Sequence, residues 1–216
     1  ANYSNNSIVT WYSNSTGGLS LFTGANFVTP NVGTTTSYYV QAGVSTPNSV
    51  VKVGNGTALS TVAGESPLFY NYGGYKHQYI YTAEELLTAG LMAGPINSVA
   101  FDVKTASTVN REGFTIYIGN TTQNVATSTH ISGLTLVYSN AAQPMNLGVN
   151  PYLFTSPFIW DGLSNIVVQI NWSNNNGGSY SESGSVAYHS TSPVSKTTYT
   201  YADSRTPDQF LATLTG

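Results

Sequence analysis

Short runs in which hydrophobic and polar residues alternate recur along the chain, and clusters of Gly, Asn, Pro and Ser separate them. Alternation with period two places apolar side chains on one face of an extended strand and polar side chains on the other. We therefore predict an all-β protein whose strands cover residues 8–12, 36–42, 98–104, 114–119, 134–138, 166–172, 186–190 and 197–201. Their spacing favours an antiparallel β-sandwich over a fold of alternating strands and helices.

The strand over residues 166–172 has the clearest division into faces. We predict that its apolar face, made by Ile166, Val168, Ile170 and Trp172, packs into the core. The opposite face is mixed and consists of Val167, Gln169 and Asn171. The strand over 98–104 shows the same pattern, with Val99, Phe101 and Val103 on the face predicted to be half-buried.

One short helix near residues 83–89 interrupts this pattern. Thr82 is followed three residues later by Glu85, and this spacing is a capping box that satisfies the unpaired backbone donors of a helix start. Gly90 supplies a stop signal. We predict that the helix buries Leu86, Leu87 and Leu91.

Residues 77–103 (HQYIYTAEELLTAGLMAGPINSVAFDV) closely resemble a signature of β-sandwich modules in very large secreted and cell-surface proteins of the Bacteroidetes, bacteria that use gliding adhesins and type IX secretion. The segments over 114–122, 133–139, 154–172 and 186–192 resemble the later strands of that family in order. The resemblance covers roughly residues 50–205. It implies a jelly-roll-like β-sandwich in an extracellular protein that is secreted or held at the cell surface. It also implies neighbouring modules in the same long chain.

The N-terminal segment over residues 9–42 resembles the second half of the immunoglobulin-like repeats in the same large proteins. The polar, proline-containing run GVSTPNS at 43–49 separates the two regions of resemblance. We therefore divide the chain into a partial immunoglobulin-like β segment at 1–43 and a jelly-roll-like sandwich at 44–216. Half of an immunoglobulin-like domain exposes strand edges, so we expect residues 1–42 to pack on the sandwich or to have further strands upstream.

Composition limits the functions that such a chain can have. Only 7% of its 216 residues are charged, against about 25% in ordinary soluble domains, and the formal net charge is -3. No basic run could neutralise a phosphate backbone, so we predict no nucleic-acid binding. No apolar run approaches the ~20 residues that a membrane-spanning helix needs, and no cysteine is present to form disulfides. The predicted surface is neutral and rich in hydroxyl and amide groups, which suits an extracellular protein.

Catalytic motifs are missing from the sequence. It has no Gly-x-Ser-x-Gly elbow, no His-Glu-x-x-His motif and no phosphate-binding glycine loop. The histidines at 77, 130 and 189 stand far apart, and we assign them structural roles. Asp161 lies in a Trp-Asp-Gly turn, where an Asp side chain bonds to nearby backbone groups. We predict that the protein is not an enzyme.

Aromatic residues are the remaining candidates for function. The run FYNYGGYKHQYIY at 69–81 is the densest cluster, and Tyr70, Tyr72 and Tyr75 flank a Gly-Gly turn within it. Tyrosine combines an apolar ring with a hydroxyl that stays hydrated, so we name these three residues as ligand-binding candidates. The competing interpretation is that tyrosine merely replaces charged residues on strand faces.

No cofactor is predicted. If an ion has a structural role, we expect calcium bound by loop oxygens, for example near Asp161, Asp203 or Asp208, and the sequence assigns no ligand set.

The leading hypothesis is a non-enzymatic module of a large bacterial adhesin that presents a Tyr-rich surface to polysaccharide or another surface ligand. Two alternatives stay open. One is a carbohydrate-binding module of a secreted hydrolase, since sandwich folds host both roles. The other is a structural spacer or filament subunit whose edge strands pair with the next module.

Overall fold

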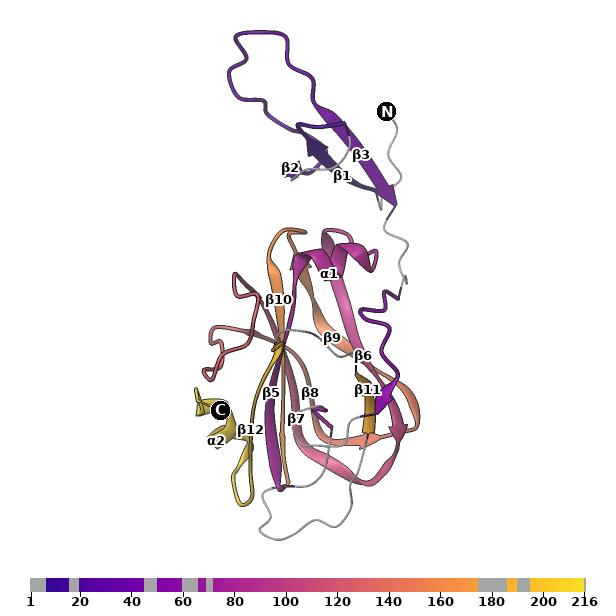
Figure 1. The fold of residues 1–216 in the computed structure, drawn as a ribbon, viewed down its shortest axis with the longest axis vertical. Coiled ribbons are helices and arrows are strands. Elements are labelled where there is room, and N and C mark those ends of the chain that lie inside the picture. The colour runs from indigo at the N-terminus through magenta and orange to yellow at the C-terminus, as the bar shows by residue number, and fades with distance from the viewer. Residues whose placement is uncertain are drawn as a thin grey trace. The chain divides into compact units, whose positions relative to one another are not determined.

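The computed structural model describes residues 7–15, 20–44, 50–59, 66–68, 72–174, 186–189 and 195–215. The chain divides into two compact units, residues 1–51 and residues 52–216, and both are built from antiparallel strands (Figure 1). The all-β prediction is therefore confirmed.

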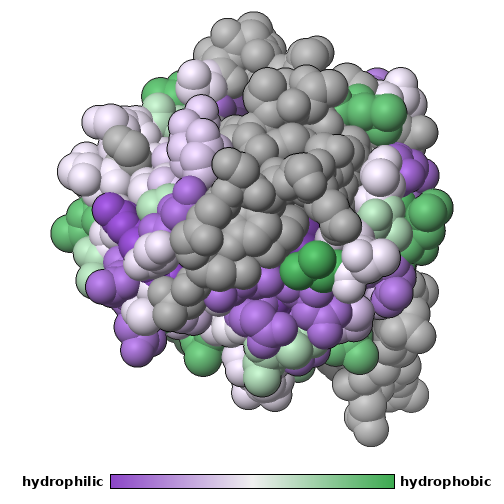
Figure 2. Space-filling model, turned by 90° about the horizontal axis from the view of Figure 1, so that it is seen from below, coloured by the Kyte–Doolittle hydropathy of each residue, from purple (hydrophilic) through white to green (hydrophobic). Residues whose placement is uncertain are grey.

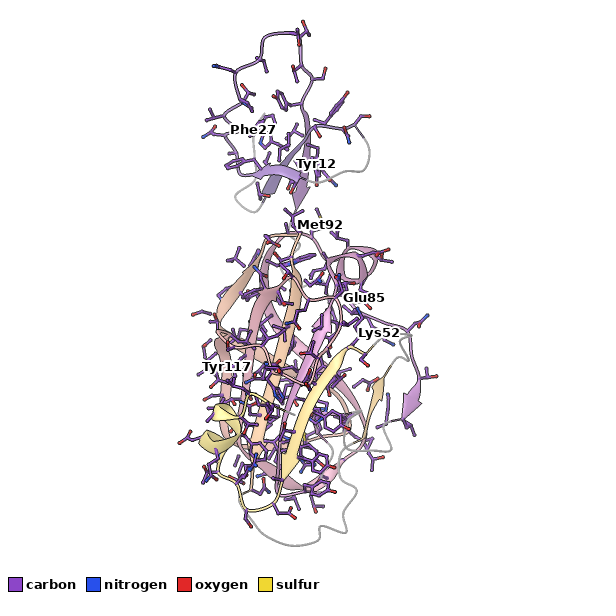
Figure 3. The ribbon with its side chains drawn as sticks, turned by 60° about the vertical axis from the view of Figure 1, so that its left-hand side comes forward. Tyr12, Phe27, Lys52, Glu85, Met92 and Tyr117 are labelled. Carbon is purple, nitrogen blue, oxygen red and sulfur yellow. The ribbon has the colours of Figure 1, made fainter. Side chains whose placement is uncertain are left out.

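The first unit is a small antiparallel sheet in the order β2-β1-β3. Its strands are β1 (Ser7–Tyr12), β2 (Ser20–Thr23) and β3 (Tyr39–Val44). Phe27 centres an aromatic cluster, with ring centroids 5.6 Å from Trp11 and 5.3 Å from Tyr38 (Figure 3). The Trp11 indole also donates a 3.0 Å hydrogen bond to the Gly24 carbonyl, so the loop after β2 is tied to β1.

The second unit is a sandwich of two antiparallel sheets. One sheet has five strands in the order β12-β5-β10-β7-β8, and the other has four in the order β4-β11-β6-β9. The strands are β4 (Ala58–Leu59), β5 (Gly74–Tyr81), β6 (Gly94–Thr105), β7 (Ser107–Thr121), β8 (Thr135–Met145), β9 (Gly148–Trp160), β10 (Asn165–Ser173), β11 (Val186–His189) and β12 (Thr197–Ala202). Strand β10 lies at the centre of the larger sheet.

The hydrophobic core joins side chains from both sheets. Its members from the five-stranded sheet include Tyr75, Phe114, Ile116, Ile118 and Val137, and those from the other sheet include Val103, Tyr152 and Trp160. The predicted core face of β10 is confirmed, because Ile166, Val168, Ile170 and Trp172 are all buried in this cluster. The half-buried face of β6 is confirmed as well, since Val103 is buried and both Val99 and Phe101 pack against the core.

A buried arginine completes the core. The Arg111 guanidinium is fully buried, and it donates to the Leu68 carbonyl at 3.2 and 2.7 Å and to the Val109 carbonyl at 2.6 Å. It also lies 4.9 Å from the centroid of the Trp172 ring, in cation–π geometry. Main-chain carbonyls and an aromatic ring therefore stabilise this charge inside the sandwich.

The outer face of the sheet is also buried at strands β5 and β10, which the alternation pattern did not indicate. Val167, Gln169 and Asn171 on β10 are all buried. The Gln78 side chain on β5 donates to the Ile131 carbonyl at 2.7 Å and to the Gln169 side chain at 2.6 Å. Its oxygen accepts a 2.7 Å hydrogen bond from the Ile131 amide, so the loop around residue 131 is fixed over the sheet.

The C-terminal segment also packs on this outer face, over β5 and β10. Helix α2 (Pro207–Ala212) begins with a capping box between Thr206 and Gln209 and buries Phe210. The helix packs closely on β5, because a Cβ atom on Gly74 would lie 2.5 Å from the Phe210 ring. The buried Lys76 ammonium donates to the Leu211 carbonyl at 3.2 Å and to the Thr213 carbonyl at 2.6 Å. These bonds satisfy carbonyls that the end of a helix leaves without partners.

His130 is buried in the same layer of polar side chains, which lies between the outer face of β5 and β10 and the segments that cover it. Its backbone amide donates a 2.7 Å hydrogen bond to the Leu214 carbonyl, which joins the loop to the C-terminal segment. Burial, and secondly the nearby Lys76 charge, lower the pKa of the His130 imidazole from 6.5 to about 4. The fold therefore favours the neutral imidazole.

Helix α1 (Ala83–Thr88) confirms the predicted capping box. The Thr82 hydroxyl accepts from the Glu85 amide at 3.2 Å, and the Glu85 carboxylate accepts from the Thr82 amide at 2.7 Å. Glu85 lies on α1 near the start of that helix (Figure 3). Leu86 is buried and Leu91 is partly buried, but the prediction for Leu87 was wrong because its side chain is exposed.

We expect Thr82→Ala to lower the free energy of unfolding by about 1 kcal/mol, because it removes one half of the capping box. Denaturant titration monitored by circular dichroism measures this loss. Thr88→Ala is the matched control: Thr88 is an exposed residue at the other end of the same helix, and its replacement should change stability by less than about 0.5 kcal/mol. Equal effects of the two substitutions would show that the capping box contributes nothing specific.

We also expect acid to destabilise the fold through His130. The folded-state pKa of about 4 lies below the ordinary value of 6.5. Between these values the unfolded chain binds more protons than the folded chain, so stability is fully present above pH 6.5 and falls as the pH drops towards 4. The loss attributable to His130 is at most about 3 kcal/mol.

Unfolding free energies of the wild type and of His130→Gln across this pH range test that assignment. The variant should have a flatter pH dependence than the wild type, whereas Ser132→Ala, at an exposed position in the same loop, should keep the wild-type slope. A wild-type slope in His130→Gln would contradict the assignment.

Candidate functional site

The structure places the three predicted ligand-binding tyrosines in different settings. Tyr72 is partly exposed just before β5. Tyr75 is fully buried, with its ring centroid 5.2 Å from that of Trp172, so its side chain belongs to the core in this conformation and not to a surface. Tyr70 lies outside the described residues. The Tyr75 position follows from pairing, because β5 lies between β10 and β12 and its odd-numbered side chains face the sandwich interior.

Strand β12 brings two further tyrosines to this region. Tyr199 pairs with His77 and Tyr201 pairs with Tyr75 in the antiparallel register of β12 and β5. The same face of the sheet therefore carries aromatic rings on two neighbouring strands. We name this group the tyrosine ladder, and its members are Tyr72, Tyr75, His77, Tyr79, Tyr199 and Tyr201.

Rings in the tyrosine ladder stack along each strand and across the strand pair. Along β5, the His77 ring centroid lies 5.4 Å from Tyr75 and 5.8 Å from Tyr79, with interplanar angles of 14° and 12°. Along β12, Tyr199 and Tyr201 are 6.1 Å apart at 17°. His77 and Tyr199 connect the two strands at 5.6 Å and 20°. Aromatic pairs of this kind contribute roughly 0.5–1.5 kcal/mol each beyond area burial.

The ladder is buried on β5 and partly open on β12. Tyr79 is largely enclosed, and burial raises the pKa of its hydroxyl well above 10.0. Tyr199 and Tyr201 keep 39% and 40% of their surface exposed, because β12 is the edge strand of its sheet. The rings on β12 are therefore the part of the ladder on these two strands that a partner can reach.

A groove of about 460 Å³ runs beside β12. The described residues that line it carry hydroxyl groups and are Thr127, Ser128, Thr197, Thr198, Tyr199, Thr200 and Tyr201. The Thr198 hydroxyl donates a 2.7 Å hydrogen bond to the Thr127 carbonyl, which holds the far wall of the groove against the strand. Such a lining offers many weak donors and acceptors and no formal charge.

The Asp161 carboxyl group is held in a turn. The Asp161 carboxylate accepts hydrogen bonds from the Leu163 amide at 2.9 Å and from the Ser164 amide at 2.8 Å, which confirms the predicted turn. Burial would raise the pKa of this carboxyl group, but the hydrogen bonds outweigh burial and lower it. Within the described residues, no group of three or more His, Cys, Asp or Glu side chains could hold a metal ion.

The three histidines do not meet. His77 is buried in the tyrosine ladder, and His130 is buried beneath the C-terminal segment on the opposite face of the sheet. His189 lies on β11, and its side chain is outside the described residues. The site thus consists of aromatic and hydroxyl groups. The sequence pattern did not indicate its exposed members Tyr199 and Tyr201, because only the register between β12 and β5 brings them beside the other rings.

Comparison with known protein families finds a likeness in the N-terminal part of the chain. Residues 1–60 match the family model described as "Ig-like domain CHU_C associated". No curated protein and no solved structure matches the chain. Among the described residues, no helix is long and apolar enough to cross a membrane. The N-terminal segment is therefore immunoglobulin-like, as predicted, and it is followed by a separate antiparallel β-sandwich unit.

Proposed function

We propose that this chain is a non-enzymatic extracellular module of a large bacterial cell-surface or secreted adhesin. The immunoglobulin-like match at residues 1–60 supports an extracellular type of module. The resemblance of the sandwich to modules of Bacteroidetes proteins supports export by type IX secretion, in a chain with neighbouring modules. The division into segments 1–43 and 44–216 remains part of this proposal.

The exposed side of the tyrosine ladder is the observation that carries the proposal. Tyr199 and Tyr201 stand partly exposed beside a hydroxyl-lined groove, and Tyr72 stacks on Tyr201. Tyrosine side chains lose little conformational entropy on binding and combine apolar and hydrogen-bonding contact. These properties fit an uncharged partner such as a polysaccharide. Tyr72 and Tyr70 stay candidates for the same contact.

A neutral surface suits adhesion in variable surroundings. Hydrophobic residues are scattered among hydrophilic ones on the face shown in Figure 2 and form no broad continuous patch among the coloured residues. With 7% charged residues, few contacts of this protein can be screened by salt. One such site binds weakly, and strength would come from many modules acting together.

A carbohydrate-binding module of a secreted hydrolase would use the same surface. The groove beside β12 favours this alternative equally, because its hydroxyl lining matches the hydrogen-bonding groups of a sugar chain. The two roles differ in the domains that accompany the module and not in the chemistry of the site.

A structural spacer or filament subunit is favoured by a different observation. Edge strand β9 exposes apolar side chains, with Leu153 at 71% exposure and Val149 and Ile159 also exposed. Such an edge can pair with another chain. Pro151 and Pro157 on the same strand lack the amide donors that pairing uses, so they limit this contact.

We expect the double variant Tyr199→Ala, Tyr201→Ala to lose affinity for an uncharged polysaccharide by about tenfold or more, because it removes the two exposed ladder rings on β12. A glycan array and a soluble-polysaccharide screen of the full chain, with and without calcium, identify the ligand and measure the loss. Tyr39→Ala is the matched control, since Tyr39 is 41% exposed and lies in the first unit. Circular dichroism verifies that each variant is folded.

Unchanged binding by the folded double variant would show that Tyr199 and Tyr201 are not part of the binding site. If the wild-type chain binds no glycan in either condition, the ligand-binding proposal fails and the spacer role is favoured. Sedimentation of the wild-type chain at high concentration then tests for end-to-end assembly.

A further inference from the structure

Tyr72 and Tyr201 form the tightest ring pair in the described part of the chain. Their centroids are 4.0 Å apart and their planes differ by 25°. The neighbouring Tyr201 side chain is also the first cause of the raised pKa of the Tyr72 hydroxyl. The two rings therefore lie nearly parallel and face to face, so ring carbons of one tyrosine are in contact with ring carbons of the other.

Strand pairing and one side-chain hydrogen bond hold together the two segments that carry this ring pair. Tyr201 lies on β12 in register with Tyr75 on β5. The Asp203 carboxylate, two residues beyond Tyr201, accepts a 2.7 Å hydrogen bond from the Gly73 amide, one residue beyond Tyr72. Two segments that are far apart in the sequence are thus held together at this point. Reaction between groups fixed in this way has a large advantage over reaction between separate molecules.

We propose that Tyr72 and Tyr201 are a site of oxidative cross-linking and join as dityrosine when the protein meets a one-electron oxidant, such as a haem peroxidase supplied with hydrogen peroxide. Tyr201 is 40% exposed and Tyr72 is partly exposed, so an oxidant can reach the pair. The chain contains no cysteine, and this bond would give it a covalent link that disulfides cannot supply. The inference does not rest on the proposed adhesive function.

The reaction balances with peroxide as the oxidant. Each phenol gives one electron and one proton to the peroxidase, and the two phenoxyl radicals combine through the carbons next to their oxygens. A carbon–carbon bond forms, and each ring regains its aromatic state when the proton on the coupled carbon moves to the oxygen. Two hydrogen atoms leave the protein in total, and they reduce one hydrogen peroxide to two waters.

The rest of the tyrosine ladder provides neighbours from which an oxidised state can reach this pair. The Tyr201 ring centroid lies 6.1 Å from that of Tyr199 and 5.9 Å from that of Tyr75. Tyr75 in turn lies 5.2 Å from Trp172 in the core. A radical formed on another ladder ring is therefore close to Tyr201, where coupling to Tyr72 would consume it.

The cross-link would hold the edge of the five-stranded sheet. It would connect the end of β12 to the residues that precede β5, at the boundary where the sheet is otherwise held by main-chain pairing. A strand fixed at its end by a covalent bond resists peeling from the sheet.

To test this, the full chain is oxidised at low concentration with peroxidase and hydrogen peroxide. The monomer is then isolated, and its cross-links are mapped by proteolysis and tandem mass spectrometry. We expect one dominant dityrosine between the peptides that contain Tyr72 and Tyr201, with the loss of two hydrogen atoms. Tyr72→Phe and Tyr201→Phe keep the stacked ring but lose the phenol, so each should reduce dityrosine in the monomer on the order of tenfold or more.

Tyr39→Phe is the control for general tyrosine oxidation, because Tyr39 is 41% exposed and lies in the first unit. It should leave the Tyr72–Tyr201 yield unchanged. The proposal is overturned if oxidised monomer lacks this link while other tyrosines react, if dityrosine forms mainly between chains, or if Tyr72→Phe leaves the yield in the monomer intact. The assay contains no glycan, so its outcome is independent of the adhesion test.

Discussion

Burial of strands β5 and β10 on both faces is the constraint on which the second unit depends. Central strand β10 has no solvent-facing side, since Ile170 packs into the sandwich while Gln169 and Asn171 are buried beneath the loop around residue 131 and the C-terminal segment. Polar side chains on the covered face need hydrogen-bond partners, because an unpaired buried polar group costs about 1–3 kcal/mol. Gln78 and Lys76 meet this need by bonding to main-chain groups of the cover.

The low charge of the chain shapes both its interior and its surface. Arg111 and Lys76 are among only six Lys and Arg residues, yet both are buried and both bond to main-chain carbonyls. The surface therefore depends on hydroxyl, amide and aromatic groups. Where the sheet ends at β12, the ring stack of the interior continues to the surface at Tyr199 and Tyr201. The same stack thus stabilises the edge and supplies the neutral contact surface of the proposed function.

Local signals predicted the features that depend on neighbouring residues. The Thr82–Glu85 spacing located α1, and alternation located β10 with its core face. Helix α2 carries a similar local signal, with Thr206 and Gln209 in a capping box and Pro207 between them. Strand β9 was absent from the strands predicted by alternation, because Pro151 and Pro157 interrupt the pattern and are tolerated at a sheet edge.

Features that depend on distant pairing could not be predicted from one sequence. The covered outer face requires contacts of Gln78 with residues 131 and 169, and the tyrosine ladder requires the register between β5 and β12. For the same reason Tyr75 was named as a surface candidate although it is a core residue here, and Tyr201 was missed. The unfolding midpoint in denaturant of a variant that lacks residues 203–216 tests the two-face burial most directly. We expect a much lower midpoint or loss of folding, because the buried polar side chains on β5 and β10 lose their cover. A midpoint equal to that of the full chain would contradict the two-face burial.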